Sequence, residues 1–300
     1  MQWVRKHQPN PEQERFYRVA IFITLGGNLL LAVAKGIVAY LSGSAAIYSD
    51  AANSVSDVIY SVLMVLGLWM ALRPPDLSHP QGHSRYEPLV GLVVTASMAF
   101  AGFEAARNAI NRYMQNTLTP ITLDLPIIIL LASAGIKVFM YLTISRISKR
   151  ILSPTLATTA RDNLSDVLSS LAAFLGVLGS NFIHPLADPI AGFLVALWIF
   201  RNAFLAGREN LGFLTGRGAS REEVEAFVSA VEEVPGVLKV HHIMTDYVGP
   251  RLMIDVHINV DGQKTLRESH EISDDVIRKL EAFPNVDRAY VHLEPHDWKD

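Results

Sequence analysis

Residues 46–72 have the sequence AIYSDAANSVSDVIYSVLMVLGLWMAL, in which a short polar stretch lies inside a long apolar run. An α-helix needs roughly 20 predominantly apolar residues to cross the hydrocarbon core of a bilayer. The segment is long enough to do so, and it predicts a membrane-spanning helix. Five other segments share this length and character, so we predict spans at 18–41, 46–72, 86–112, 122–146, 155–181 and 184–207.

The composition agrees with a membrane protein. Half of the residues are hydrophobic, 18% are charged, and the mean hydropathy is +0.25, which is too apolar for an ordinary soluble enzyme of this length. The absence of cysteine excludes disulfides and thiolate metal sites. We find no basic cluster that would indicate a nucleic-acid partner. The polar start of the chain is not typical of a cleavable signal peptide.

The distribution of positive charge predicts the orientation of the spans. Basic residues precede the first span and follow the second and fourth, whereas the turns at 42–45 and 180–184 and the region 113–121 carry none. Positive residues are enriched on the cytoplasmic side of membrane proteins, so we expect both termini in the cytoplasm. The basic residues concerned are Arg5, Lys6, Arg15, Arg18, Arg73, Arg85, Arg146, Lys149 and Arg150.

The last third of the chain has the pattern of a soluble domain. Helical periodicity at SREEVEAFVSAVEEV is followed by two alternating stretches that Gly249 and Pro250 separate, a second amphipathic helix and a last strand. The fold class is therefore an α-helical membrane protein with six transmembrane helices and a cytoplasmic α+β domain of order α-β-β-α-β. We expect an N-terminal segment at 1–17, a transport domain at 18–207 and a metal-binding and dimerisation domain at 208–300.

Two related polar motifs interrupt the second and fifth spans. NSVSD contains Asn53 and Asp57, and DNLSD contains Asp162 and Asp166. Residues four apart lie about 40° from each other around a helix, so each pair shares a face. Carboxylates inside a membrane must be paired, protonated, metal-bound or hydrated, and we expect them to ligate a divalent cation. Asp50 is a further possible ligand, although it could instead cap a helix.

The six spans, the paired motifs and the α+β tail resemble the cation diffusion facilitator family of metal/proton antiporters. The resemblance implies a secondary transporter rather than an enzyme, without a cofactor, working as a homodimer in contact with membrane lipid. It implies a transport site of Asn53, Asp57, Asp162 and Asp166. We expect such a compact chain in a bacterial inner (plasma) membrane.

The metal follows from the ligands. Zinc transporters of the family carry histidine in these motifs, whereas this site has only oxygen ligands, which suit Mn²⁺. We therefore predict Mn²⁺ efflux by proton antiport, as in the family's manganese-type members, with export of Fe²⁺ or Zn²⁺ as the alternative. Crowded carboxylates repel one another, so we expect them to hold the protons that the cation displaces.

The resemblance implies two further metal sites. Asp76, His79 and His83 match a site in the loop after the second span, although a polar loop with incidental histidines is the alternative reading. The second site, in the tail, consists of His241, His257, His270, His292 and Glu294, with His242 as a competitor of His241. Arg85 matches a residue that locks the dimer in some members, but Gly216 stands where its acidic partner would be.

Two functions of other classes have the same broad features. A membrane-tethered metal sensor would use the spans as an anchor, and an intramembrane hydrolase would use paired aspartates as acid and base. An anchor has no use for Asp57 and Asp166, and a hydrolase needs no histidine-rich tail. Other polar residues of the spans, Lys35, Glu104, Lys137 and Asp188, are expected to be paired or near water without being ligands.

Overall fold

The computed structural model describes residues 3–4, 11–42, 45–115, 125–182, 184 and 186–296. Within these ranges, the side chains of Asp50 and Asp188 are not described, so the proposed roles of both lie outside the described structure. The chain divides into two units, Met1–Leu211 and Gly212–Asp300, and each is considered by itself.

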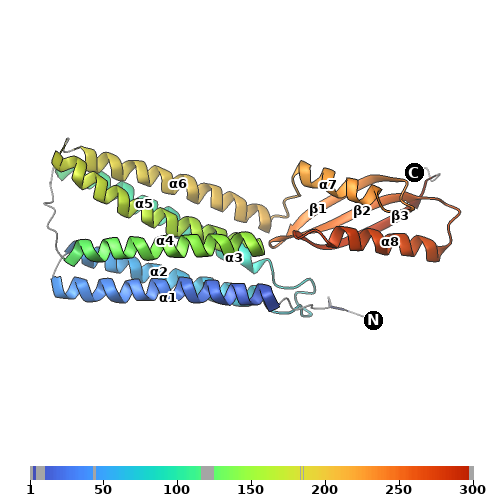
Figure 1. Cartoon of the computed structure of the whole chain (residues 1–300), viewed down its shortest axis with the longest axis horizontal. Coiled ribbons are helices and arrows are strands. Elements are labelled where there is room, and N and C mark those ends of the chain that lie inside the picture. The colour runs from blue at the N-terminus through green and yellow to red at the C-terminus, as the bar shows by residue number, and fades with distance from the viewer. Residues whose placement is uncertain are drawn as a thin grey trace. The chain divides into compact units, whose positions relative to one another are not determined.

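The described residues of the first unit form six long helices (Figure 1). Most of these helices begin before or end after the span that was predicted for them. The reason is that charged residues such as Glu12, Arg15 and Glu209 continue a helix although they do not favour hydrocarbon. The helices are α1 (Pro11–Ser42), α2 (Ala45–Ala71), α3 (Tyr86–Gln115), α4 (Leu125–Ile151), α5 (Pro154–Phe182) and α6 (Ala187–Leu214).

The helices pack as a bundle in which α4 contacts α1 and α5, while α2 contacts α1 and α3. A cluster of buried side chains lies at the end where α1 begins and α4 ends, around Tyr17, Met64 and Ile144. There, a Cβ atom at Gly67 of α2 would lie 1.8 Å from Cγ2 of Val90 of α3, so only glycine allows this approach. The close approach of α2 to α3 at this point therefore requires glycine at position 67.

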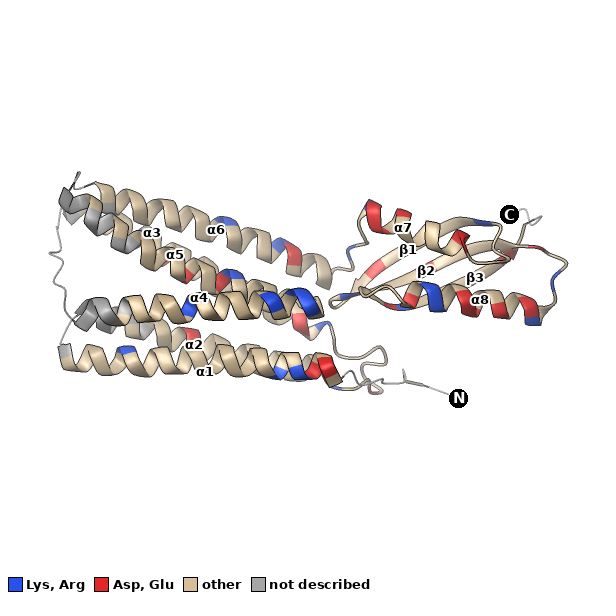
Figure 2. Ribbon diagram, viewed as in Figure 1, with Lys and Arg blue, Asp and Glu red and all other residues tan. Residues whose placement is uncertain are grey.

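The surface of the bundle is apolar. Phe22 is 79% exposed, and many other large hydrophobic side chains are exposed on every long helix of this unit. Such a surface is suited to lipid and not to water. Charged residues gather instead at the end where α1 begins and α4 ends (Figure 2), where Arg150 pairs with Glu12 at 3.3 Å.

Four helices of the described part are long and apolar enough to cross a membrane: α1 over Pro11–Leu41, α2 over Asn53–Ala71, α3 over Tyr86–Asn111 and α6 over Pro189–Leu214. The spans predicted at 122–146 and 155–181 correspond to α4 and α5. The latter carries Arg161, Asp162 and Asp166 close together, which lowers its apolar character. The number of six spans stays a prediction.

The second unit has the predicted order of elements: α7 (Arg221–Glu232), β1 (Lys239–Val248), β2 (Arg251–Val260), α8 (Leu266–Glu281) and β3 (Val286–Pro295). β1 and β2 are antiparallel and joined through Gly249, whose φ is +71°. β3 pairs with β2 in parallel, which requires the crossover that α8 provides. The strand order β1-β2-β3 therefore places β2 at the centre.

Alternation along β2 separates the two faces of this sheet. Leu252, Ile254, Val256 and Ile258 are buried in a core with side chains of α7 and α8, whereas His257 and its alternate neighbours point to the other face. Both helices begin with a capping box, formed by Ser220 with Glu223 and by Thr265 with Glu268. The unit thus has its own core and leaves one sheet face free of helices.

Candidate metal sites

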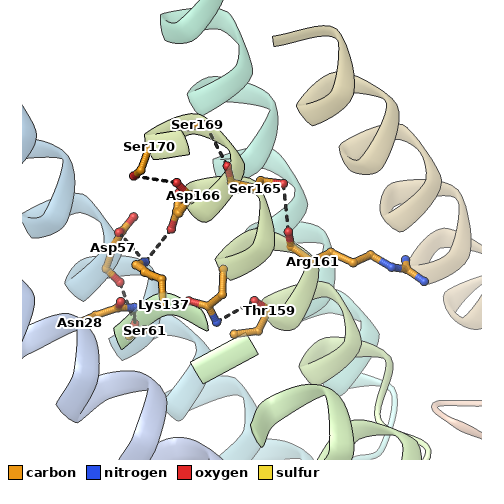
Figure 3. Close-up of polar contacts among 11 residues, drawn as sticks. Asn28, Asp57, Ser61, Lys137, Thr159, Arg161, Ser165, Asp166, Ser169 and Ser170 are labelled. Atoms are coloured by element: carbon orange, nitrogen blue, oxygen red, sulfur yellow. Dashed lines mark hydrogen bonds and ion pairs between the residues drawn. The ribbon is translucent and has the colours of Figure 1, made fainter. Parts of the chain in front are cut away.

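Asp57 and Asp166 lie across from each other inside the helical bundle, as the two motifs predict. Each points from its own helix, α2 or α5, toward the side chain of Lys137 on α4 (Figure 3). The Lys137 ammonium lies 3.0 Å from Asp57 Oδ2 and 2.6 Å from Asp166 Oδ2. Two carboxylates from different helices therefore hold one cationic group between them.

The other two residues of the predicted transport site, Asp162 and Asn53, differ in how close they lie to this pair of carboxylates. Asp162 is one turn before Asp166 on α5 and lies close enough to interact electrostatically with Asp57, Asp166 and Lys137. Asn53 lies one turn before Asp57 on α2 and is exposed. The structure thus brings three carboxylates toward one point, with Asn53 at the margin.

Polar contacts fix the backbone at the level of Asp57. The Ser61 hydroxyl donates to the Asp57 carbonyl oxygen at 2.7 Å, and Asn28 Nδ2 of α1 donates to Ser61 Oγ at 2.8 Å (Figure 3). On α5, the Ser165 hydroxyl donates to the Arg161 carbonyl oxygen of its own helix at 2.9 Å. Ser165 is therefore engaged within its helix, in agreement with a packing role rather than a ligand role.

The sequence predicts that Lys137 is paired or near water, but it does not show that its partners are Asp57 and Asp166. The only signal in the sequence was an intramembrane lysine, which must have a partner. Which partner it has depends on how α4 is shifted and rotated against α2 and α5, and no local pattern records that. The neighbouring Arg161 points away from this site and pairs with Glu209 of α6 at 2.7 Å (Figure 3).

The loop between α2 and α3 brings Asp76, His79 and His83 together. Their possible ligand atoms lie within 4.8 Å of one another, with Asp76 Oδ2 3.4 Å from His83 Nε2. Gly82, with φ of +103°, allows the tight turn between the histidines. The backbone N–H of His79 donates to Asp76 Oδ1 and lowers the pKa of Asp76, which favours the ionised carboxylate.

His83 differs from the other two because it is buried, and its Nδ1 has no partner among the described residues. A buried nitrogen without a partner is costly unless something binds to it. Asp76, His79 and His83 are therefore placed together, and metal binding by this loop stays a prediction.

The helix-free face of the sheet carries a second cluster around Glu294. Its Oε2 lies 3.3 Å from His241 Nε2, and its Oε1 lies 3.5 Å from His257 Nδ1 and 3.6 Å from His292 Nε2. Three of these groups, from His241, His257 and Glu294, have ligand atoms within 4.8 Å of one another. The cluster draws on all three strands.

A break in the register of β1 explains why His242 also belongs here. The pairing with β2 shifts between Val240 and His242, so strict alternation of side chains fails at this point. The rings of His241 and His242 lie 5.7 and 4.9 Å from that of His257. Among the described residues, however, the group whose ligand atoms lie within 4.8 Å of one another includes His241 and not His242, so the geometry favours His241 as the candidate ligand.

His270, by contrast, is not brought into this cluster. It lies on α8, it is 73% exposed, and its Nε2 is 3.8 Å from Asp274 of the same helix. Since α8 packs on the buried face of the sheet, His270 is separated from Glu294 by the sheet itself. Within one chain, the five residues implied for the tail site therefore form a group of four and an isolated histidine.

Residues 21–215 match the family of the cation efflux transmembrane domain, and residues 219–296 match the cytoplasmic domain of cation efflux proteins. The first match alone covers more than half of the chain. The chain belongs to the cation efflux family. Members of the cation efflux family are transporters and not enzymes, so the chain is a membrane protein that moves divalent metal cations. The predicted resemblance to cation diffusion facilitators is confirmed.

Two curated relatives cover nearly the whole chain. An uncharacterized transporter of Methanocaldococcus jannaschii is 33% identical over 91% of this chain and 96% of its own length. The manganese efflux system protein MneS of Bacillus subtilis is 28% identical over 92% and 95%. Among solved structures, a cadmium form of the MamM CTD is 28% identical and covers 26% of this chain and 98% of its own, with a TM-score of 0.25.

Proposed function

We propose that this cation efflux protein exports Mn²⁺ in exchange for protons, through a site formed by Asp57, Asp162 and Asp166 with Asn53. The observation that carries the proposal is the convergence of Asp57 and Asp166, from two helices, on one cationic group inside the bundle. A pair of carboxylates that holds an ammonium there also has the charge to attract a metal cation.

The donor atoms support manganese. All four side chains offer oxygen, which suits Mn²⁺, whereas a site that prefers Zn²⁺ usually includes imidazole. The similarity to a relative named as a manganese efflux protein points to the same metal. The intramembrane site has no histidine to offer, so selectivity would rest on the carboxylates and the amide.

Proton exchange follows from the same carboxylates. Three acidic groups close together in a poorly hydrated place repel one another, and either protons or a divalent cation relieves that repulsion. Cation and protons therefore compete for one set of oxygen atoms. If the site opens alternately to each side, the competition couples metal leaving to protons entering.

The wider arrangement that we propose has six spans with both termini in the cytoplasm. The concentration of basic residues at the end where α1 begins and α4 ends supports that end as the cytoplasmic one (Figure 2). We further propose that the protein is a homodimer in a plasma membrane, that the clusters around Asp76 and Glu294 bind metal, and that metal at Glu294 favours association of two tails.

The test is transport by the purified protein in liposomes that carry a pH gradient. We expect Mn²⁺ flux that depends on the gradient and is abolished in Asp57→Asn. The matched control is Glu104→Gln, which neutralises a carboxylate of α3 that pairs with Arg107 of the same helix. Its flux should remain close to that of the wild type.

Three other results would reject parts of the proposal. Zn²⁺ or Fe²⁺ flux without Mn²⁺ flux would reject manganese but keep the transport site. Flux that is equal in Asp57→Asn and wild type would reject the site. No flux of any of these metals, with metal binding retained by the tail, would favour a membrane-tethered sensor.

A further inference from the structure

The buried ammonium of Lys137 is the feature of the bundle that the transport mechanism above does not use. Its side chain is 6% exposed, and it comes from α4, which carries neither of the two motifs. It contacts Asp57 and Asp166 at the same time, at 3.0 and 2.6 Å. A lysine serving only to neutralise one buried acid would need only one of these contacts.

The place that this ammonium occupies is the one that a bound metal needs. Oxygen ligands lie about 2.0–2.2 Å from a small divalent cation, so a cation shared by Asp57 and Asp166 must lie between their carboxylates. Lys137 Nζ is already there (Figure 3). Two positive centres at such short range repel strongly where little water screens them.

We propose that Lys137 is a tethered competitor of the transported cation. Its ammonium holds Asp57 and Asp166 together while the site is empty of metal, and it is displaced from between them when a divalent cation binds. This inference rests on the proposed transport site, and it assigns a role to a residue outside the two motifs.

The competition has two consequences for transport. It weakens metal binding, which favours release on the far side of the membrane, because a returning ammonium replaces the departing metal. It also favours divalent over monovalent cations, since an ion with a single charge gains no more from the two carboxylates than the ammonium that it must replace.

The test compares Lys137→Met, which keeps the length of the side chain without its charge, with Lys137→Arg, which keeps the charge. Both are made in a full-length chain carrying His83→Ala and His257→Ala, so that binding at the loop and tail clusters is weakened. Mn²⁺ affinity is measured in detergent by calorimetry at mildly alkaline pH, where protons compete least. Thermal unfolding checks that each variant is folded.

We expect Lys137→Met to bind Mn²⁺ about tenfold more tightly than its parent, and Lys137→Arg to stay near the parent; tenfold corresponds to about 1.4 kcal/mol. Unchanged or weaker binding by folded Lys137→Met would overturn the inference. Adding Asp57→Asn separates the two hypotheses. If it leaves Mn²⁺ binding intact in the parent, the proposed transport site fails, whatever Lys137 does.

A second measurement on the wild-type chain needs no substitution at Lys137. Displacement by metal predicts that labelling of Lys137 by an amine-reactive reagent, quantified by mass spectrometry, increases when Mn²⁺ is added. Equal labelling with and without saturating Mn²⁺ would overturn the inference even if the Lys137→Met protein does not fold.

Discussion

Replacing Glu294 with glutamine should sharply weaken metal binding by the tail. Two ligand atoms about 2.1 Å from one tetrahedral metal ion are about 3.4 Å apart. The distances from the Glu294 carboxylate to three histidine nitrogens, 3.3, 3.5 and 3.6 Å, are close to that value. The cluster therefore needs little rearrangement to bind an ion, and Glu294 supplies its central negative charge.

Loss of a contact that supports a metal ligand typically costs about 10–100-fold in metal affinity, or about 1.4–2.7 kcal/mol, and loss of a ligand should cost at least as much. We expect this reduction for Glu294→Gln in the isolated unit Gly212–Asp300, which has its own buried core. The assay is calorimetric titration with Zn²⁺, a suitable probe because imidazoles dominate the cluster. Circular dichroism confirms that each variant is folded.

Two control variants make the result specific. Asp274→Asn changes a carboxylate that lies near His270 and outside the cluster, so it should leave Zn²⁺ affinity unchanged. Equal affinity of Glu294→Gln and wild type would refute the assignment of the site. If His270→Ala lowered the affinity as much as Glu294→Gln, the single-chain cluster would be incomplete.

Two predictions concern stability. The backbone N–H of Thr265 lowers the pKa of Glu268, so the ionised carboxylate stabilises the fold above the pKa of the unfolded chain, and this contribution is lost as pH falls through the lowered folded pKa. Urea unfolding of the tail should therefore show Glu268→Gln to be less stable than wild type at neutral pH and equal to it in strong acid; a difference that persists in acid would contradict the capping explanation. Gly67→Ala should lower the thermal stability of the full chain by several degrees, because its Cβ would overlap Val90, whereas Gly26→Ala, which has open space, should not. Equal melting temperatures for these two variants would show that α2 and α3 separate easily.

Local patterns predicted much of the fold. The length of the apolar runs identified the segments that form the long helices. The alternation of apolar and polar residues on either side of a Gly-Pro turn predicted β1 and β2. The spacing of Asp57 and Asp166 within their motifs predicted two carboxylates facing a common site. These features depend on residues a few positions apart, which a single sequence displays.

The remaining features depend on how distant elements are shifted against each other. Lys137 shows no motif with Asp57 or Asp166, and only the packing of α4 brings them together. His242 joins the tail cluster because the register of β1 slips by one residue, and His270 is set apart because α8 covers the other face. Hydrophobic patterns specify which face is buried, but not such slips or interhelical alignments.

Two hydrogen bonds near Asp57 affect how the helices can move: Asn28 donates to Ser61, and Ser61 donates to the Asp57 carbonyl oxygen. The first of them joins α1 to α2 at the depth of Asp57. Any sliding of α2 that moves Asp57 toward one membrane surface must carry α1 with it or break a buried hydrogen bond. We therefore expect α1 and α2 to move together at this level for as long as the bond between Asn28 and Ser61 is kept.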